Sequence, residues 1–283
     1  MPDQSKLRNV SDTALWVAMY RARETERRDA VFRDPWARRL AGERGELIAA
    51  QLAPPGKQDW PFIARTYLFD RLISTEIEDG ADTVINLAAG LDARPYRMEL
   101  PASLLWFDVD LPEMIEYKNE ILRTDRPRCQ VERVALDVAD RGARKALFER
   151  IAGSAGRVLV LAEGLLVYLT ETPVGELADD IGAQPTFRSW AIDLATPALL
   201  RMLQRQWGTQ LGEASAPLKF APADGLDFFE RRDWRAVDVQ SVVKAAGRLR
   251  RLPPVLRLLV LLPESKRPGP KSVWSGVCPL QKG

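Results

Sequence analysis

From Gly80 onward, short apolar runs alternate with segments of helical periodicity. The five clearest runs span 84–89, 104–109, 131–136, 157–164 and 189–196, and helical sequence follows the second, third and fourth of them. Continuous apolar runs are typical of strands buried on both faces of a parallel sheet. The alternation therefore predicts an α/β fold with a doubly wound, mostly parallel sheet. Two less regular segments, 234–239 and 272–280, bring the expected number of strands to seven.

The first 80 residues have a different pattern. Residues 12–50 are helical in periodicity, with a helix start at Asp34-Pro35, and an apolar stripe predicts a further helix over 60–78. We therefore expect an N-terminal helical cap over 1–80 and a Rossmann-like α/β domain over 81–283. Residues 197–226 carry Pro, Gly and long side chains, and we expect them to form a lid insertion over a cleft. A chain of 283 residues, 46% of them hydrophobic, can bury a core of this size.

Histidine is absent from the chain, which excludes several classes of enzyme. Neither a Ser-His-Asp nor a Cys-His catalytic arrangement can form, and His-ligated zinc or iron is excluded as well. Cys129 and Cys278 are too few and too far apart for a metal cluster or a disulfide framework, so we expect no metal site and a reducing compartment. The N-terminus does not read as a secretory signal, and no apolar stretch reaches the length of a membrane span, so we expect a cytoplasmic protein with no membrane partner. A net charge of +2 predicts no nucleic-acid partner.

Acidic residues mark the ends of the predicted strands. Gly90 follows the first strand, and the next four end at Asp110, Asp137, Glu163 and Asp193. Ligands of open α/β sheets bind beyond the carboxyl ends of the strands, so these side chains should line the ligand site. Asp108 and Asp110 alternate along one strand, so only one of the two can face that site.

The turn at Gly90 favours a nucleoside ligand without phosphates. Asp110 follows Gly90 by 20 residues, a spacing at which an acid accepts hydrogen bonds from ribose hydroxyls. A dinucleotide needs a turn of the type G-x-G-x-x-G, but positions 91–94 read Leu-Asp-Ala-Arg, and Asp92 would repel a pyrophosphate. S-adenosyl-L-methionine has a ribose, an adenine and a sulfonium cation but no phosphate, so we expect it to be the cofactor.

Several motifs of the chain resemble one known family. The runs VINLAAGLDARPYRM, WFDVDLPEMIEYKNEIL, LDVAD and LAEGLLVYL resemble the leucine carboxyl methyltransferase-like family of class I S-adenosylmethionine-dependent methyltransferases, which includes bacterial polyketide O-methyltransferases. The N-terminal SDTALWVAMYRARETERRDAVFRDPWA and the later RTYLFD are similar to this family as well. The resemblance covers roughly residues 10–200 and implies the Rossmann-like methyltransferase fold.

With this resemblance in view, four residues are expected on the adenosyl side of the cofactor. Gly90 would let the backbone approach the cofactor because it has no Cβ. The resemblance favours Asp110 over its neighbour as the ribose ligand, and Asp137 with the backbone of Val138 would accept from the adenine amine. The alternatives are an ordinary turn for the glycine and helix capping for the two aspartates.

The resemblance also implies roles at the methyl end. It places Glu163 near the methionine part of the cofactor, with an internal ion pair to an arginine as the alternative. Glu163 and Tyr168 are the candidate catalytic residues, and core packing or capping is the alternative for Tyr168. Arg65 is expected to bind the cofactor carboxylate, since its planar guanidinium matches that group. Arg21 is a second candidate for the same carboxylate, and Arg23 is its competitor.

These expectations together predict transfer of a methyl group to an oxygen. The acceptor would be a carboxylate or phenolic hydroxyl of a small molecule such as a polyketide-type metabolite, free or bound to a carrier protein. A basic stretch from Lys244 to Lys271 would hold an acidic substrate or carrier. The alternatives are an NAD(P)-dependent Rossmann reductase, which the single glycine disfavours, and a non-catalytic S-adenosylmethionine-binding relic.

Overall fold

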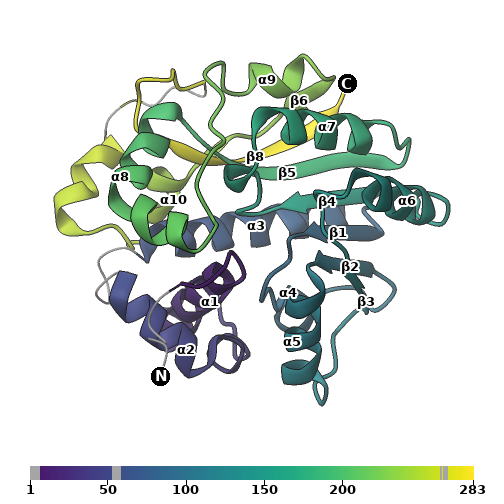
Figure 1. Ribbon diagram of the computed structural model, residues 1–283, viewed down its shortest axis with the longest axis horizontal. Coiled ribbons are helices and arrows are strands. Elements are labelled where there is room, and N and C mark those ends of the chain that lie inside the picture. The colour runs from purple at the N-terminus through teal and green to yellow at the C-terminus, as the bar shows by residue number, and fades with distance from the viewer. Residues whose placement is uncertain (1–6, 53–58, 262, 264–266) are drawn as a thin grey trace.

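The computed structural model describes residues 7–52, 59–261, 263 and 267–283, and its centre is a sheet of eight strands (Figure 1). The strands are β1 (Thr83–Leu87), β2 (Leu105–Asp110), β3 (Gln130–Ala135), β4 (Val158–Ala162), β5 (Phe187–Ala195), β6 (Trp234–Ala236), β7 (Gln240–Ser241) and β8 (Ser275–Lys282). Their order is β3-β2-β1-β4-β5-β8-β6, with β7 paired to β8. The first five are parallel, and β8 is antiparallel to β5.

The predicted doubly wound, mostly parallel sheet is confirmed, with a small difference at its C-terminal side. The strand expected over 234–239 ends at Ala236, because the next residues leave the ladder before Gln240 pairs with Val277 of β8. A two-residue strand therefore exists in addition to the seven expected. The last strand begins at Ser275 rather than at 272.

Helices cover both faces of the sheet. The helices are α1 (Asp12–Thr25), α2 (Ala37–Leu52), α3 (Trp60–Glu78), α4 (Arg94–Arg97), α5 (Pro112–Leu122), α6 (Arg141–Ala152), α7 (Glu171–Gly182), α8 (Pro197–Glu213), α9 (Asp227–Glu230) and α10 (Val242–Arg248), with 3₁₀ helices η1 (Leu166–Tyr168) and η2 (Pro254–Leu261). The apolar sides of α6 and α7 share one buried cluster with β1, β4 and β5, whereas α3 and α10 pack in a second cluster on the opposite face. Although α3 lies within the first 80 residues, it belongs to this sheet-covering layer.

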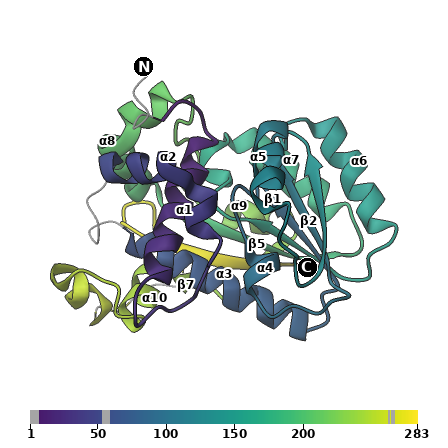
Figure 2. The ribbon, with the colours of Figure 1, turned by 90° about the horizontal axis from the view of Figure 1, so that it is seen from below.

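A third buried cluster joins α1, α2 and α8 beyond one end of the sheet, and both views place these helices together (Figures 1 and 2). The connection between α1 and α2 is held by tertiary contacts, since the Asp34 amide donates to Thr25 Oγ1 (2.7 Å) and the Asp34 carboxylate accepts from Arg21 Nε (2.9 Å). The segment 197–226 consists of α8 and an irregular stretch that ends at Leu226, the N-cap of α9. In the described part of the chain, no helix has the length and apolar character needed to cross a membrane.

Candidate functional site

A cavity of about 880 Å³ lies beyond the carboxyl ends of β1, β2, β4 and β5. The chain runs from β1 to β2 and β3 on one side and returns to β4 on the other, so the cavity opens at the topological switch point where α/β sheets bind ligands. Eight of the nine residues that received a candidate cofactor or catalytic role from the sequence line this cavity: Arg21, Arg65, Gly90, Asp110, Asp137, Val138, Glu163 and Tyr168.

Asp110 ends β2 and is held by two backbone amides. Its carboxylate accepts from Gly90 N (2.6 Å) and from Leu111 N (2.7 Å). Burial raises the pKa of this carboxyl, although the two amides act in the opposite direction. Asp108 points the other way, into a fully buried contact with Lys118 Nζ (2.7 Å), as the alternation along the strand predicted. Each Asp110 oxygen keeps a lone pair that can accept from a ligand hydroxyl.

The turn between β1 and α4 needs a glycine at position 90. Gly90 has a φ of +48°, in the left-handed region that side chains disfavour. A Cβ at this position would also lie 3.1 Å from the Cβ of Ala14 on α1. The preceding Ala88 has a φ of +51°, so two residues of this cavity-lining turn have left-handed backbone. Backbone of this kind is concentrated at binding sites, where surrounding contacts hold it in place.

Asp137 and Val138 line the cavity beyond β3. Asp137 is exposed, and its carboxylate accepts from Ala139 N (2.8 Å). The N-cap of α6 is Asp140, whose side chain accepts from Ala143 N, so the capping alternative for Asp137 is not what the structure shows. Asp137 keeps acceptor capacity for a ligand amine.

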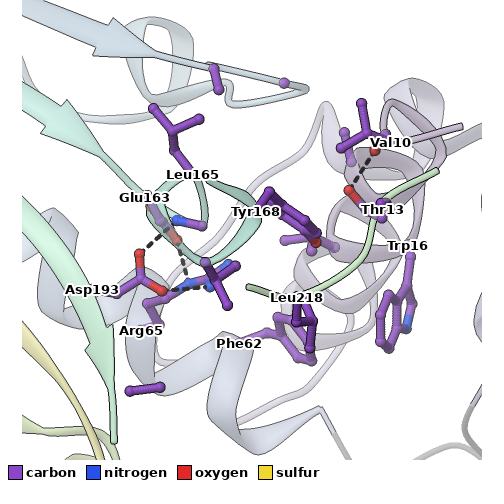
Figure 3. A pocket seen from close by; sticks show the side chains of 18 of the residues that line it. Val10, Thr13, Trp16, Phe62, Arg65, Glu163, Leu165, Tyr168, Asp193 and Leu218 are labelled. Carbon is purple, nitrogen blue, oxygen red and sulfur yellow. Dashed lines mark hydrogen bonds and ion pairs between the residues drawn. The ribbon is translucent and has the colours of Figure 1, made fainter. Parts of the chain in front are cut away.

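Arginines and carboxylates meet at the ends of β4 and β5 (Figure 3). Arg65 Nε donates to Glu163 Oε1 (3.1 Å), and Arg65 Nη1 donates to Asp193 Oδ2 (3.1 Å). The second oxygen of Glu163 accepts from Arg94 Nη2 (2.8 Å). Burial acts to lower the pKa of the Arg65 guanidinium, but Asp193 and Glu163 outweigh it and hold the pKa above its ordinary value.

This cluster continues under the cavity toward α1. Arg94 also contacts Asp92 and Asp70 (2.7 Å each). Arg97 links Asp70 to Asp34, which pairs with Arg21. We call these nine side chains the ion-pair cluster: Arg21, Arg65, Arg94, Arg97, Asp34, Asp70, Asp92, Glu163 and Asp193. It contains five acids and four arginines, so it carries one excess negative charge when all are ionised.

The cluster changes how the predicted arginines are to be interpreted. The internal ion pair, left open as the alternative for Glu163, is what the structure shows. Arg65 and Arg21 face the cavity with their guanidinium groups engaged by protein carboxylates, and Arg21 also donates to the Leu91 carbonyl (2.6 Å). Arg23 does not line the cavity. Sequence reasoning missed Arg94 as the centre of the cluster, and its place in the LDAR turn was the only local signal.

Tyr168 and a group of rings form the opposite side of the cavity (Figure 3). Burial raises the pKa of the Tyr168 hydroxyl, while a hydrogen bond with Thr13 and the charge of Arg65 act against this rise. The hydroxyl therefore keeps its proton at neutral pH. Trp16 of α1, Phe62 of α3 and Trp207 of α8 line the same side. Twelve residues of the predicted lid segment line the cavity, among them Leu199, Leu203, Trp207, Leu211, Leu218 and Phe220.

Two solved structures resemble the fold. A DUF574 family protein from Streptomyces avermitilis MA-4680 superposes with a TM-score of 0.58, at 12% identity over 94% of this chain and 97% of that one. A provisionally named methyltransferase from Thermobifida fusca YX gives a TM-score of 0.57, at 16% identity over 98% and 96% of the two chains. At these identities, the likeness concerns the fold alone.

Sequence comparison identifies the family. A provisionally named S-adenosyl-L-methionine-dependent methyltransferase of Frankia alni is 32% identical over 244 residues, which is 79% of this chain and 85% of that protein. A protein of Mycobacteroides abscessus with the same provisional name is 34% identical over 191 residues, 62% of this chain and 61% of that protein. The family model described as leucine carboxyl methyltransferase matches residues 14–182, which is more than half of the chain. The chain therefore belongs to the leucine carboxyl methyltransferase family.

Proposed function

We propose that the chain transfers the methyl group of S-adenosyl-L-methionine to a carboxylate or phenolic oxygen of a small molecule. Membership of the family and relatives named as S-adenosyl-L-methionine-dependent methyltransferases support the donor. The family description names a carboxyl group, which supports an oxygen acceptor. The observation that carries the proposal is Asp110, fixed on the Gly90 amide at the switch point and facing a cavity with acids along its floor.

The residues of the cavity fit this donor better than they fit a dinucleotide. A pyrophosphate needs several backbone amides and cations, whereas the Gly90 amide is already bound by Asp110 and the three arginines of the cavity wall are bound by carboxylates. The cavity-lining members of the ion-pair cluster balance in charge, so Asp110 adds a negative charge that attracts a sulfonium cation. The charge of the cavity therefore matches a cationic, phosphate-free nucleoside.

Each part of the donor has candidate partners among this chain's residues. Asp110 would accept from the ribose hydroxyls, and Asp137 with the Val138 backbone would hold the adenine amine. Arg65 and Arg21 would lie at the amino-acid end. When bound, the donor supplies an electrophilic methyl group with a good leaving group already attached. The protein's task is then alignment and exclusion of water, and alignment alone can supply about 7–11 kcal/mol of a barrier.

The candidate catalytic residues fit an acceptor that is already ionised. Both oxygens of Glu163 accept from arginines, so its role would be to orient neighbouring groups rather than to remove a proton. Tyr168 keeps its proton and would donate a hydrogen bond to the acceptor. A carboxylic acid, with an ordinary pKa of about 4, is ionised at neutral pH without any base. An acidified phenol would meet the same requirement.

Calorimetric titration with S-adenosyl-L-methionine and with NADPH tests the donor, and labelled-methyl turnover on matched panels of carboxylic acids and phenols tests the reaction. We expect binding of the first ligand only, and turnover of carboxylic acids in preference to unactivated phenols. Binding of NADPH instead would overturn the donor assignment, and donor binding without turnover on any panel would favour a non-catalytic relic. The two buried free thiols, Cys129 and Cys278, support a reducing, cytoplasmic setting for the reaction.

A further inference from the structure

We propose that the acceptor is a planar aromatic molecule carrying a negative charge, that Trp16, Phe62 and Trp207 form its binding wall, and that Lys219 binds its charged group. The inference deepens the proposed function, on which it rests for the identity of the reaction. It is carried by three observations: an aromatic wall, a cation without a partner in the described chain, and a segment that fixes this cation at the cavity.

The aromatic wall comes from three different helices. The ring centroids of Trp16 and Phe62 lie 5.3 Å apart, and those of Trp16 and Trp207 lie 5.1 Å apart. The Trp16–Trp207 pair is edge-to-face, with an interplanar angle of 84°, so the wall offers both a ring face and a ring edge. Aromatic ligands bind such walls through offset-stacked and edge-to-face contacts. A cavity of about 880 Å³ lies near the upper end of the roughly 300–1,000 Å³ that small-molecule sites span, which is consistent with an acceptor bound beside a nucleoside.

Lys219 differs from the other cations of the cavity. Arg21, Arg65 and Arg94 line the cavity, but each is paired with one or more carboxylates. Lys219 lines it too and is exposed, and within the described ranges its ammonium group has no hydrogen-bond or ion-pair partner in the protein. An ammonium group in this position attracts an anion. Lys219 lies on the segment that follows α8, so the anion would bind on that side of the cavity.

The backbone around Lys219 is fixed rather than loosely placed. The amides of Lys219 and Phe220 both donate to the Val167 carbonyl, at 2.6 and 3.1 Å. Gln204 Nε2 of α8 donates to the Leu218 carbonyl (2.8 Å), and the Leu218 side chain is buried. The segment is thus bound to η1, which carries Tyr168, and to α8, which carries the third ring of the wall. These contacts fix the backbone from which Lys219 reaches the cavity that the three rings also line.

The electrostatics of the two sides also favour this placement. The floor of the cavity carries the carboxylate of Asp110, while the members of the ion-pair cluster that line the cavity, three acids and three arginines, balance in charge. An anionic acceptor is repelled by that floor and attracted by Lys219. The charged group of the acceptor therefore settles on the Lys219 side, with its rings against the wall.

A matched pair of probes tests the assignment: 1-naphthoate, a planar aromatic carboxylate, and 1-naphthamide, its uncharged counterpart. Titration calorimetry would measure both probes with the wild-type chain and with Lys219→Gln, Lys219→Arg and Trp207→Ala. Lys145→Gln serves as a matched control because Lys145 is an exposed lysine of α6 that does not line the cavity. We expect Lys219→Gln to lower the affinity for naphthoate at least tenfold and to change the affinity for naphthamide less than twofold. Lys219→Arg should retain most of the affinity for naphthoate, and Trp207→Ala should lower the affinity for both probes.

The assignment is overturned if naphthoate does not bind, or if Lys219→Gln and Lys145→Gln have equal effects on it. It is also overturned if Trp207→Ala leaves both probes unchanged. The affinity for S-adenosyl-L-methionine, measured on the same variants, separates this inference from the proposed function. If S-adenosyl-L-methionine binds but the variants do not change naphthoate and naphthamide binding as expected, only the acceptor assignment is refuted. If the wild-type chain binds naphthoate but not S-adenosyl-L-methionine, the proposed function is refuted and the acceptor assignment is not.

Discussion

Arg94→Met is the substitution that most directly tests the ion-pair cluster. The Arg94 side chain is 3% exposed and contacts three carboxylates, those of Asp70, Asp92 and Glu163, at 2.7–2.8 Å. Methionine has a similar volume and no charge, so the variant removes the cation without opening a large cavity. Removing one partner of a buried ion pair costs about 3–5 kcal/mol, because it leaves an uncompensated charge behind.

The structure indicates where in that range the effect should fall. Without Arg94, Asp70 still pairs with Arg97 and Glu163 still pairs with Arg65. Asp92 loses its direct charge partner and keeps the Asn86 amide (3.0 Å). One carboxylate out of three is therefore stranded, and we expect the free energy of unfolding to fall by about 3 kcal/mol, at the lower end of the range.

Urea denaturation of both proteins measures this loss, and its pH dependence tests the cause. Burial acts to raise the pKa of Asp92, but Arg94 and the neighbouring cations outweigh it and hold the pKa well below its ordinary value. A depressed carboxyl pKa gives stability that is present above about pH 4 and is lost as pH falls toward the folded-state value. The difference in the free energy of unfolding between wild type and Arg94→Met should therefore become smaller below about pH 4.

A double variant and a surface control complete the test. Adding Asp92→Asn to Arg94→Met should raise the free energy of unfolding by at least ~1 kcal/mol, because it removes the carboxylate that has lost its charge partner. Arg150→Met breaks the Arg150–Glu132 pair, in which both side chains are about half exposed, and should cost at most about 1 kcal/mol. A loss below ~1 kcal/mol in Arg94→Met, or no recovery in the double variant, would show that the cluster does not stabilise the cavity floor.

Three further predictions concern the turn after β1 and the thiols. Asp110→Asn should weaken donor binding about tenfold or more in calorimetry, because an amide cannot accept from both backbone amides and loses the charge-assisted bonds to ribose; unchanged affinity would misplace the ribose site. Gly90→Ala should lower the free energy of unfolding by about 1–3 kcal/mol and by more than Gly225→Ala, which has a similar φ of +59° but open space around it; equal losses would argue against the close contact with α1. Burial raises the pKa of Cys129 to about 11 and that of Cys278 further, so neither thiol should react with a disulfide reagent at pH 8 until urea unfolds the chain.

Local sequence patterns account for most of the fold. Four parallel strands, β1, β2, β4 and β5, are largely buried, and their continuous apolar runs located them to within a few residues. The fifth, β3, was expected to be buried as well, but it stands at the edge of the sheet and its residues are exposed or half-buried. The helix expected over 60–78 is α3 with the same bounds. Beyond residue 230 the patterns are weaker, because short strands such as β6 and β7 depend on pairing with β8 rather than on their own periodicity.

The candidate site was predictable in position but not in its pairing. Acids at strand ends must meet at one edge of a parallel sheet, so the cavity wall follows from the chain order. Which arginine meets which acid depends on contacts such as Arg65 with Asp193, which are 128 residues apart in the sequence. The carboxylate-binding geometry of its guanidinium and the family resemblance assigned Arg65 to the ligand, whereas tertiary packing gives it protein partners. The same reasoning missed Arg94, whose neighbours come from α3, β4 and its own turn.

The two sides of the cavity also differ in how far family membership describes them. The family match ends at residue 182 and so includes the turn at Gly90, Asp110 and the β4 end at Glu163. Trp207 and Lys219 lie beyond that match, on α8 and on the segment bound to η1. The strand ends that would hold the donor thus lie within the family match together with Trp16 and Phe62 of the wall, whereas Trp207 and Lys219 lie outside it. On the proposed assignment, substitutions in α8 and the following segment would alter the acceptor side of the cavity and leave in place the strand ends that would hold the donor.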